Sequence, residues 1–349
     1  MTNLRKQIAQ MLVMGFNGTC LNEQHVAYRW VRQEGIGGVI LFDENLGNLH
    51  VPKNLVEPKQ IKLLTTTLQR WAQEYDPSLS LLISADVEGG EVDRLKTIPP
   101  YLTTLSARSL AKLSVEEFAS EISKMAKNMH SLGFNLNFAP VVDLSFDTKN
   151  NFINNRGRSF AKAANEVNRL ATLFVKIFHE NGILCCYKHF PGHGSAEGDT
   201  HLGFVDVTST FALDELAPYR ELAKENKEYV MVMTAHVVNR HLDKTGKPAT
   251  LSHPILTQLL RNELHYQGII ISDDMQMRAI TQQYPLEEAL MLAISAGVDM
   301  LIFGNQWGDH DASHLIDVIE ELVRQKAIKE ERIHAAYARI LKFKSALHN

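Results

Sequence analysis

The sequence has little of what would set it apart from ordinary globular proteins. Its only cysteines are Cys20, Cys185 and Cys186, and an odd count with two adjacent members indicates free thiols rather than a disulfide framework. No apolar run approaches the roughly 18 residues needed to cross a bilayer, and the N-terminal segment resembles an amphipathic helix, not a signal peptide. There is no basic block, and the net charge is −4, so nothing favours nucleic acid. These absences predict a soluble, cytoplasmic protein with no nucleic-acid or membrane partner.

What the chain does have is a recurring pattern of short apolar runs, each followed by a polar stretch and then a helical pattern. Near-continuous apolarity is what parallel strands buried on both faces require. The runs cover residues 37–42, 79–86, 134–140, 183–190, 229–237, 268–274 and 299–305. Helices are predicted at 58–75, 114–132, 161–181, 212–225, 253–265, 285–296, 311–325 and 328–347. Ser114 with Glu117, and Thr210 with Asp214, are typical of helix starts.

Repeated strand–helix units form either an open doubly wound sheet or a (β/α)8 barrel. The first run is not followed by the glycine-rich loop of dinucleotide-binding sheets. Polar and ionisable residues follow at least five different runs, and a barrel joins all its strand ends in one shared site. The sequence therefore predicts an α/β protein with a single (β/α)8 TIM-like barrel, whose eighth strand lies near the N-terminus. Because no linker rich in Pro, Gly or Ser divides the chain, residues 1–349 are expected to form one domain.

Ionisable residues after these runs are the candidate site residues. Asp86 precedes a tight loop containing Glu88 and two glycines, and Arg94 can return from that loop to the same cavity. Arg158 lies just before a helix, and its guanidinium suits carboxylates or vicinal oxygens. His236 ends a later run and either lines the cavity or caps its strand, and Asn305 and Gln306, at the end of the last run, are candidate binding groups.

The segment 187–204 carries the densest set of such groups. Lys188 and His189 close a strand, and the glycine-bearing loop after them is typical of a mobile element over an active site. Asp199 and His201 are two residues apart, so the carboxylate can hydrogen-bond one imidazole nitrogen and raise the pKa of the histidine. A histidine supported in this way can donate and recover a proton near neutral pH.

Asp273 and Asp274 follow a buried strand, where two adjacent carboxylates are costly unless used or capped. One is expected to point into the barrel mouth and the other to cap the next turn, and their spacing does not say which. A carboxylate nucleophile and a separate proton donor are the parts of a retaining glycosidase. A competing interpretation is a zinc site, although no closely spaced ligand pair supports it. Its candidate ligands are His189, His193, His201, His236 and Asp273.

Together the motifs resemble glycoside hydrolase family 3, and within it the bacterial β-N-acetylhexosaminidases of the NagZ type. They are KHFPGHG with the following D-T-H, the EGG loop after Asp86, R-S-F at Arg158, T-A-H at His236 and S-D-D at Asp273. The resemblance spans roughly residues 5 to 345, nearly the whole chain. Relatives in the family carry a second sandwich domain that supplies the acid/base carboxylate. The chain is expected to lack that domain and to use a loop residue instead.

The resemblance implies that Asp273 is the catalytic nucleophile and that His201, tuned by Asp199, is the proton donor and acceptor. It assigns the terminal N-acetylglucosamine to the positions Asp86, Arg94, Arg158, Lys188 and His189. The implied enzyme is a retaining exo-β-N-acetylglucosaminidase of peptidoglycan recycling in the cytoplasm. It would act on small (anhydro)muropeptides, without a cofactor, a metal or an obligatory protein partner. The alternative from another class is a non-catalytic sugar sensor on the same barrel.

Overall fold

Eight parallel strands form a closed barrel in the computed structural model, which describes residues 3–101, 103–146, 151–200, 202–225 and 228–347. Each strand pairs with the next barrel strand along the chain, and the last pairs with the first. The strands are β1 Leu12–Met14, β2 Gly38–Ile40, β3 Leu82–Ala85, β6 Leu136–Asn137, β7 Leu184–Phe190, β9 Val230–Thr234, β11 Ile270–Asp274 and β12 Met300–Phe303. The predicted (β/α)8 barrel is confirmed, including its eighth strand near the N-terminus.

The barrel strands are buried on both faces, which explains their unbroken apolar sequences. All seven residues of β7 are buried, and β7 pairs with β9 through Cys185 opposite Val230 and Tyr187 opposite Val232. All three cysteines are free thiols, as expected, and Cys185 and Cys186 are core residues of this strand. Burial on both faces removes the alternation of polar and apolar residues that a one-sided strand would show.

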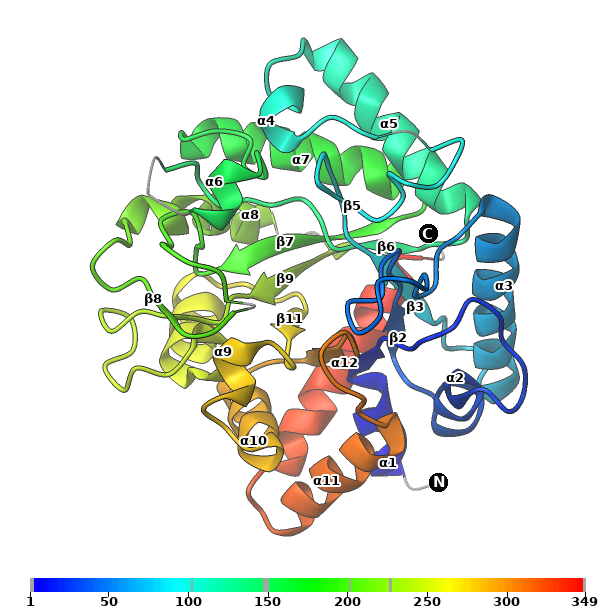
Figure 1. The fold of residues 1–349 in the computed structure, drawn as a ribbon. Coiled ribbons are helices and arrows are strands. Elements are labelled where there is room, and N and C mark those ends of the chain that lie inside the picture. The colour runs from blue at the N-terminus through cyan, green and yellow to red at the C-terminus, as the bar shows by residue number, and fades with distance from the viewer. Residues whose placement is uncertain (1–2, 102, 147–150, 201, 226–227, 348–349) are drawn as a thin grey trace.

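Helices form an outer ring around the strands (Figure 1). Each of the eight predicted stretches is helical to within a few residues of its expected ends, although the stretch at 253–265 is wound as a π-helix, η4. The longer helices are α1 Asn3–Gln10, α3 Pro58–Tyr75, α5 Val115–Ser131, α7 Ala164–Glu180, α8 Ala217–Glu225, η4 Pro254–Glu263, α10 Leu286–Ala296, α11 Ala312–Arg324 and α12 Glu330–Ser345. No helix of the described residues is both long and apolar enough to span a membrane.

Short helices and strands also lie within the loops that connect these elements. The helical ones are α2 Val26–Tyr28, η1 Arg29–Glu34, α4 Ala107–Leu110, α6 Phe152–Asn155, η2 Leu213–Leu216, η3 Ala249–Leu251 and α9 Arg278–Thr281. The extended ones are β4 Val87–Gly89, β5 Val92–Asp93, β8 Val205–Asp206 and β10 Val237–Val238. The prediction missed α2 and η1, which together link β1 to β2 and are too short for a periodic pattern to stand out.

The two predicted helix starts have different outcomes. Ser114 begins α5 with a capping box, because its hydroxyl accepts the Glu117 amide at 3.2 Å while Glu117 accepts the Ser114 amide at 3.0 Å. The start at Thr210 is wrong. The Thr210 hydroxyl donates to the carbonyl of Val207, and the helix begins after Ala212, whose amide donates to Glu215. The turn that ends at Thr210 uses up the hydroxyl that would have capped the helix.

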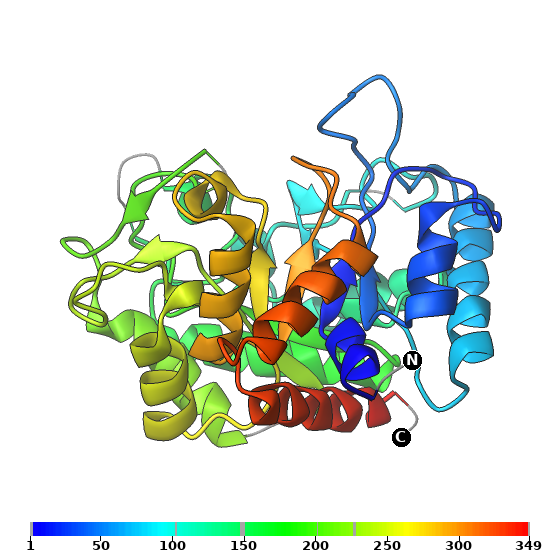
Figure 2. The same cartoon turned by 90° about the horizontal axis from the view of Figure 1, so that it is seen from below.

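The end of the barrel opposite the strands' carboxyl ends is closed by α12, which runs across it in Figure 2. Asp299, fully buried just before β12, joins this helix to the barrel. Its carboxylate pairs with Arg332 at 2.6 Å and Arg339 at 3.2 Å, both on α12, and with Arg261 on η4. It also accepts the amide of Ile270 at the start of β11, at 3.0 Å. The buried carboxylate of Asp299 therefore holds three arginine side chains and the start of β11 in place.

Replacing Asp299 with Asn should destabilise the protein by about 3–5 kcal/mol, because three arginines would lose their buried counter-charge. Urea unfolding followed by circular dichroism measures the change. Asp317, whose side chain is 63% exposed in its pair with Arg5, provides the control. Its Asn variant should stay within about 1 kcal/mol of the parent. Equal effects of the two substitutions would contradict the role given to Asp299.

Candidate active site

A pocket of about 420 Å³ opens at the carboxyl ends of the barrel strands. Parallel strands in a barrel bring the residues that follow them to one rim, whatever their separation along the chain. Seven of the eight predicted site residues line this pocket: Asp86, Arg94, Arg158, Lys188, His189, Asp199 and Asp273. The eighth, His201, lies outside the described residues. The structure thus brings together residues from the ends of β3, β7 and β11 and from the loops that follow β6 and β7.

The loop after β3 is folded tightly enough to return Arg94 to the pocket. Its turn uses Gly89 at φ 96° and Gly90 at φ 65°, a region that other residues rarely adopt. A Cβ on Gly89 would lie 2.2 Å from the carbonyl oxygen of Leu105, so the loop also needs glycine for space. The Arg94 amide then donates to the Asp86 carbonyl at 3.1 Å, and both side chains line the pocket.

Buried charges form one wall of the pocket, centred on Glu88. Arg158 binds its carboxylate through two hydrogen bonds of 2.8 and 2.7 Å, and the ammonium of Lys188 lies 2.6 Å away. Lys188 also contacts Asp86 at 2.7 Å. Burial alone would raise the pKa of Glu88, but the charges of Arg158 and Lys188 outweigh it and lower that pKa well below its ordinary value. Glu88 is therefore an anion that holds two buried cations in place.

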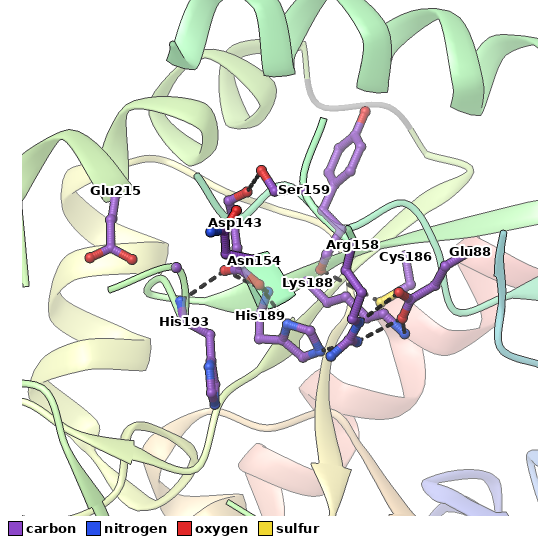
Figure 3. Close-up of polar contacts among 12 residues, drawn as sticks. Glu88, Asp143, Asn154, Arg158, Ser159, Cys186, Lys188, His189, His193 and Glu215 are labelled. Atoms are coloured by element: carbon purple, nitrogen blue, oxygen red, sulfur yellow. Dashed lines mark hydrogen bonds and ion pairs between the residues drawn. The ribbon is translucent and has the colours of Figure 1, made fainter. Parts of the chain in front are cut away.

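A second buried carboxylate, Asp143, fixes the segment that carries the histidines. It accepts the backbone amides of His189 at 3.2 Å and His193 at 2.8 Å, and its Oδ2 lies 2.7 Å from Nδ1 of His189. Burial would raise the pKa of Asp143, but the facing His189 lowers it, so the carboxylate stays charged. Figure 3 shows His189 between Asp143 and Arg158. The arginine can only donate to Nε2, at 3.3 Å, so we infer that the proton of His189 sits on Nδ1.

His193 lies beside this cluster and is electrically different from it. It is buried, its ring is 5.8 Å from that of His189, and its Nδ1 has no hydrogen-bond partner among the described residues. Burial and the neighbouring His189 lower its pKa to about 4. His193 is therefore neutral near neutral pH and can act there as a hydrogen-bonding group but not as a cation.

The adjacent carboxylates at the end of β11, Asp273 and Asp274, make different contacts. Asp274 accepts the Gln276 amide at 3.0 Å, so it caps the turn that follows the strand. Its carbonyl receives a hydrogen bond from Nε2 of His236 at 2.9 Å, while Nδ1 of His236 faces Thr250 at 2.8 Å. Asp273 lines the pocket and accepts the Asp274 amide at 2.8 Å. Asp274 is therefore the capping member, a question that the sequence pattern left open, although both carboxylates line the pocket.

Three candidates from the sequence turn out to have supporting positions. His236 is buried and is not among the described residues that line the pocket; it steadies the backbone of Asp274. Asn305 also lies outside that lining and organises its own loop, whereas Gln306 does line the pocket. Among the described residues, no three His, Cys, Asp or Glu side chains gather in a geometry that could hold a metal ion. His201, a member of the alternative zinc set, is outside that search.

Comparison with known proteins decides the family. The sequence model of the glycosyl hydrolase family 3 N terminal domain matches residues 3–343. The chain belongs to glycosyl hydrolase family 3. It is 32% identical to β-hexosaminidase A of Pseudoalteromonas piscicida over 332 residues, and this match covers 89% of this chain and 54% of that protein. It is 31% identical to the β-hexosaminidase of Idiomarina loihiensis over 278 residues, and that match covers 77% of each protein.

A solved structure shows the same likeness in three dimensions. A family 3 β-N-acetylglucosaminidase from Paenibacillus sp. str. FPU-7 superposes with a TM-score of 0.86 at 31% identity, covering 100% of this chain and 63% of that one. The chain therefore spans little more than half of the Pseudoalteromonas relative and under two thirds of the Paenibacillus protein.

Two residues that support this site were missed as site residues: Glu88, which lines the pocket, and Asp143, which holds His189 and His193 from outside the pocket lining. Glu88 was seen only as part of a tight loop, and Asp143 was not singled out at all. Asp86 directly follows β3, whereas Asp143 lies six positions after the end of β6, so a search for ionisable residues at strand ends does not single it out. Its contacts with the histidine segment span 46 and 50 positions along the chain, and no local pattern reveals them.

Glu88→Gln should lower the stability of this family 3 protein by about 3–5 kcal/mol near pH 7, since two buried cations lose their counter-charge. A carboxyl whose pKa is lowered by folding stabilises above its unfolded pKa of roughly 4.3, and that contribution is lost as the pH falls. The gap in stability between parent and variant should therefore narrow as the pH falls below about 5, because Glu88 of the unfolded parent takes up a proton while the folded carboxylate stays charged. Urea unfolding across this range measures it.

Glu91→Gln supplies the control on the same loop, because the Glu91 side chain is 64% exposed in its pair with Arg156. That variant should show no such pH-dependent gap. A gap for Glu88→Gln that stayed constant down to pH 3 would contradict the lowered pKa.

Proposed function

We propose that this family 3 protein is a retaining exo-β-N-acetylglucosaminidase acting on small cell-wall fragments. Its substrates would be (anhydro)muropeptides with a terminal β-1,4-linked N-acetylglucosamine, cleaved in the cytoplasm during peptidoglycan recycling. We further propose that residues 1–349 act as one catalytic barrel domain, with no cofactor and no obligatory protein partner. Support comes from relatives named β-hexosaminidase and from a similar structure named β-N-acetylglucosaminidase.

The observation that carries the proposal is the placement of Asp273 and Asp199 on the same pocket as the buried cation wall. A retaining glycosidase needs a carboxylate on one side of the anomeric carbon and a proton donor near the departing oxygen. Asp273 is the penultimate residue of β11 and accepts the amide of Asp274, whose own carboxylate caps the turn after the strand. Both carboxylates line the pocket, and we assign the nucleophile to Asp273 because Asp274 has this capping role and because the family resemblance implies it.

The remaining predicted residues have chemistry that suits a terminal sugar. Arg158 and Lys188 are fixed by Glu88, so they present N–H groups to sugar oxygens without a large ordering cost at binding. Asp86 accepts from Lys188 and is more exposed than Glu88, which leaves it suited to accept from a sugar hydroxyl. His189 is held by Asp143 and Arg94 lines the same pocket. We assign these five residues to the terminal N-acetylglucosamine.

In the proposed first step, Asp273 attacks the anomeric carbon while His201 protonates the oxygen of the leaving sugar. The glycosidic bond breaks, and a covalent glycosyl-enzyme forms on Asp273. In the second step, His201 takes a proton from water, and the water oxygen displaces Asp273 from the sugar. Asp199 supports His201 throughout by hydrogen bonding and by its charge, as the family resemblance implies.

The direct test is turnover of an aryl β-N-acetylglucosaminide, expected to be unchanged by a chelator. A 2-deoxy-2-fluoro glycoside with a good leaving group, in which fluorine replaces the 2-acetamido group, should accumulate as a covalent adduct, because the fluorine slows both steps. Peptide mapping by mass spectrometry should place this adduct on Asp273, and Asp273→Ala should abolish both labelling and turnover. A label on Asp274 would refute the nucleophile assignment. Binding of N-acetylglucosamine without any turnover would favour the sugar sensor.

Loss of His201 should depend on the leaving group. A general acid contributes about 10²–10⁴ in rate when the departing oxygen needs a proton. His201→Ala should therefore reduce kcat/KM far more on a disaccharide than on a nitrophenyl glycoside, which departs nearly unaided. Asp199→Ala should show the same pattern more mildly, because the imidazole remains. Equal losses on both substrates for His201→Ala would mean that this histidine binds sugar and that another group is the acid.

A further inference from the structure

The mouth of the pocket differs from its interior, because it carries exposed apolar side chains. Trp307, in the loop between β12 and α11, lines the pocket and is 50% exposed. Of the three tryptophans, all within the described residues, Trp30 and Trp71 are buried in the core. Leu46 and Leu202, from two other loops, also line the pocket and are exposed. Apolar groups left in water at the rim of a polar pocket indicate a binding surface.

The loop that carries Trp307 is held firmly by the residue two positions before it. Asn305 has a positive φ of 49°, an uncommon conformation for a residue with a side chain. Its side chain donates to the carbonyl of Gly15 at 2.9 Å and accepts the amide of His310 at 2.9 Å. The side chain of Gln276 completes the arrangement. It donates to the side-chain oxygen of Asn305 at 2.9 Å and accepts the Asn305 amide at 2.6 Å. This clamp fixes both ends of the turn at residues 305–310.

Gln306 ties the same turn to the loop between β2 and α3. Its side chain accepts the amide of Leu46 at 3.1 Å and donates to the carbonyl of Glu44 at 3.0 Å. In Figure 2 these two loops, orange and blue, rise from the same end of the barrel. The backbone that carries Trp307 is therefore held in place by its neighbour Gln306, so little of this turn has to be ordered when a ligand binds.

The two ends of the pocket suit different parts of one substrate. The polar end, built on Glu88, Arg158 and Lys188, is buried and offers charged hydrogen-bonding groups to a single terminal sugar. An indole instead offers a flat, apolar face with a polar edge, and such a face matches the C–H side of a pyranose ring. Because Trp307 stands at the open end, the ring it meets is the one that extends out of the pocket.

We propose that Trp307 is the binding platform for the leaving-group sugar, the residue linked to the reducing side of the scissile bond. This inference rests on the proposed glycosidase function and adds to it a residue that positions the leaving group. Trp307 takes no part in bond breaking. Its contact with the second ring holds the glycosidic oxygen in line with the acid, so it contributes to catalysis only when a second ring is present.

The test compares two substrates with the same terminal sugar. N,N′-diacetylchitobiose has a pyranose leaving group, whereas 2-acetamido-2-deoxy-β-glucopyranosyl azide has one too small to reach a platform. Trp307→Ala should lower kcat/KM for the disaccharide about 10-fold or more, on the scale of one lost aromatic contact. The azide should stay within about 2-fold, and Trp307→Phe should recover much of the disaccharide activity because it keeps an aromatic face.

The matched control is Leu213→Ala, which removes a side chain that is 72% exposed and is not among the described residues lining the pocket. It should leave both substrates unaffected. Equal losses on both substrates for Trp307→Ala would overturn the proposal, since the residue would then serve the terminal sugar or the fold. Unchanged rates on both would overturn it as well.

A binding measurement separates this inference from the proposed function. In Asp273→Ala, tryptophan fluorescence should change on addition of the disaccharide and much less on addition of N-acetylglucosamine, because Trp307 is the exposed indole. The change should disappear when Trp307 is also replaced by Phe. If the parent enzyme failed to cleave either substrate, this titration would still decide whether Trp307 binds the second ring. No fluorescence response to a disaccharide that the parent cleaves would reject the platform.

Discussion

The pocket depends on the buried carboxylate of Glu88, which neutralises two cations that could not otherwise stay charged away from water. Arg158 and Lys188 come from distant parts of the chain, and each is held within 2.8 Å of Glu88 by one or more contacts. Removing one partner of such a cluster leaves uncompensated charge in a buried site, which is far costlier than losing a surface pair. The cluster therefore restricts which residues can occupy these three positions, and it also stabilises the fold. It fixes where the loop after β3, the end of β7 and the segment at Arg158 must lie.

Asp143 extends this constraint from the cations to the histidines. By accepting two backbone amides and facing one imidazole, it sets the path of the chain at His189 and His193 as well as the tautomer of His189. His189 in turn accepts from Arg158, so the two carboxylates are connected through one imidazole and one guanidinium. A network in which every member is satisfied by its neighbours is rigid, and rigidity at this wall keeps its hydrogen-bond donors in place before a ligand binds.

The sequence was informative where structure depends on local pattern and uninformative where it depends on distant partners. Continuous apolar runs predicted the barrel strands, and the ionisable residues after them predicted seven pocket-lining side chains, because a closed parallel barrel leaves no other place for them. The same reasoning could not separate Asp273 from Asp274, since that difference lies in a turn contact to the Gln276 amide. It also credited Thr210 with a helix cap, although its hydroxyl is used by the preceding turn. The support given by Glu88 and Asp143 became visible only when contacts across the barrel were known.

The contrast between the two ends of the pocket bears on how selective each end can be. A site built from buried charges rejects a sugar that lacks a matching hydroxyl, because the unpaired charges would remain desolvated. An apolar rim discriminates weakly, since exchanging one ring for another of similar shape changes little buried area. In this pocket the charged wall is fixed by Glu88 and Asp143, whereas Trp307, Leu46 and Leu202 stand partly in water at the opening. For the proposed glycosidase we therefore expect strict recognition of the terminal sugar and tolerance of the group attached to it, with this tolerance residing in loops that can change without disturbing the barrel or its buried charges.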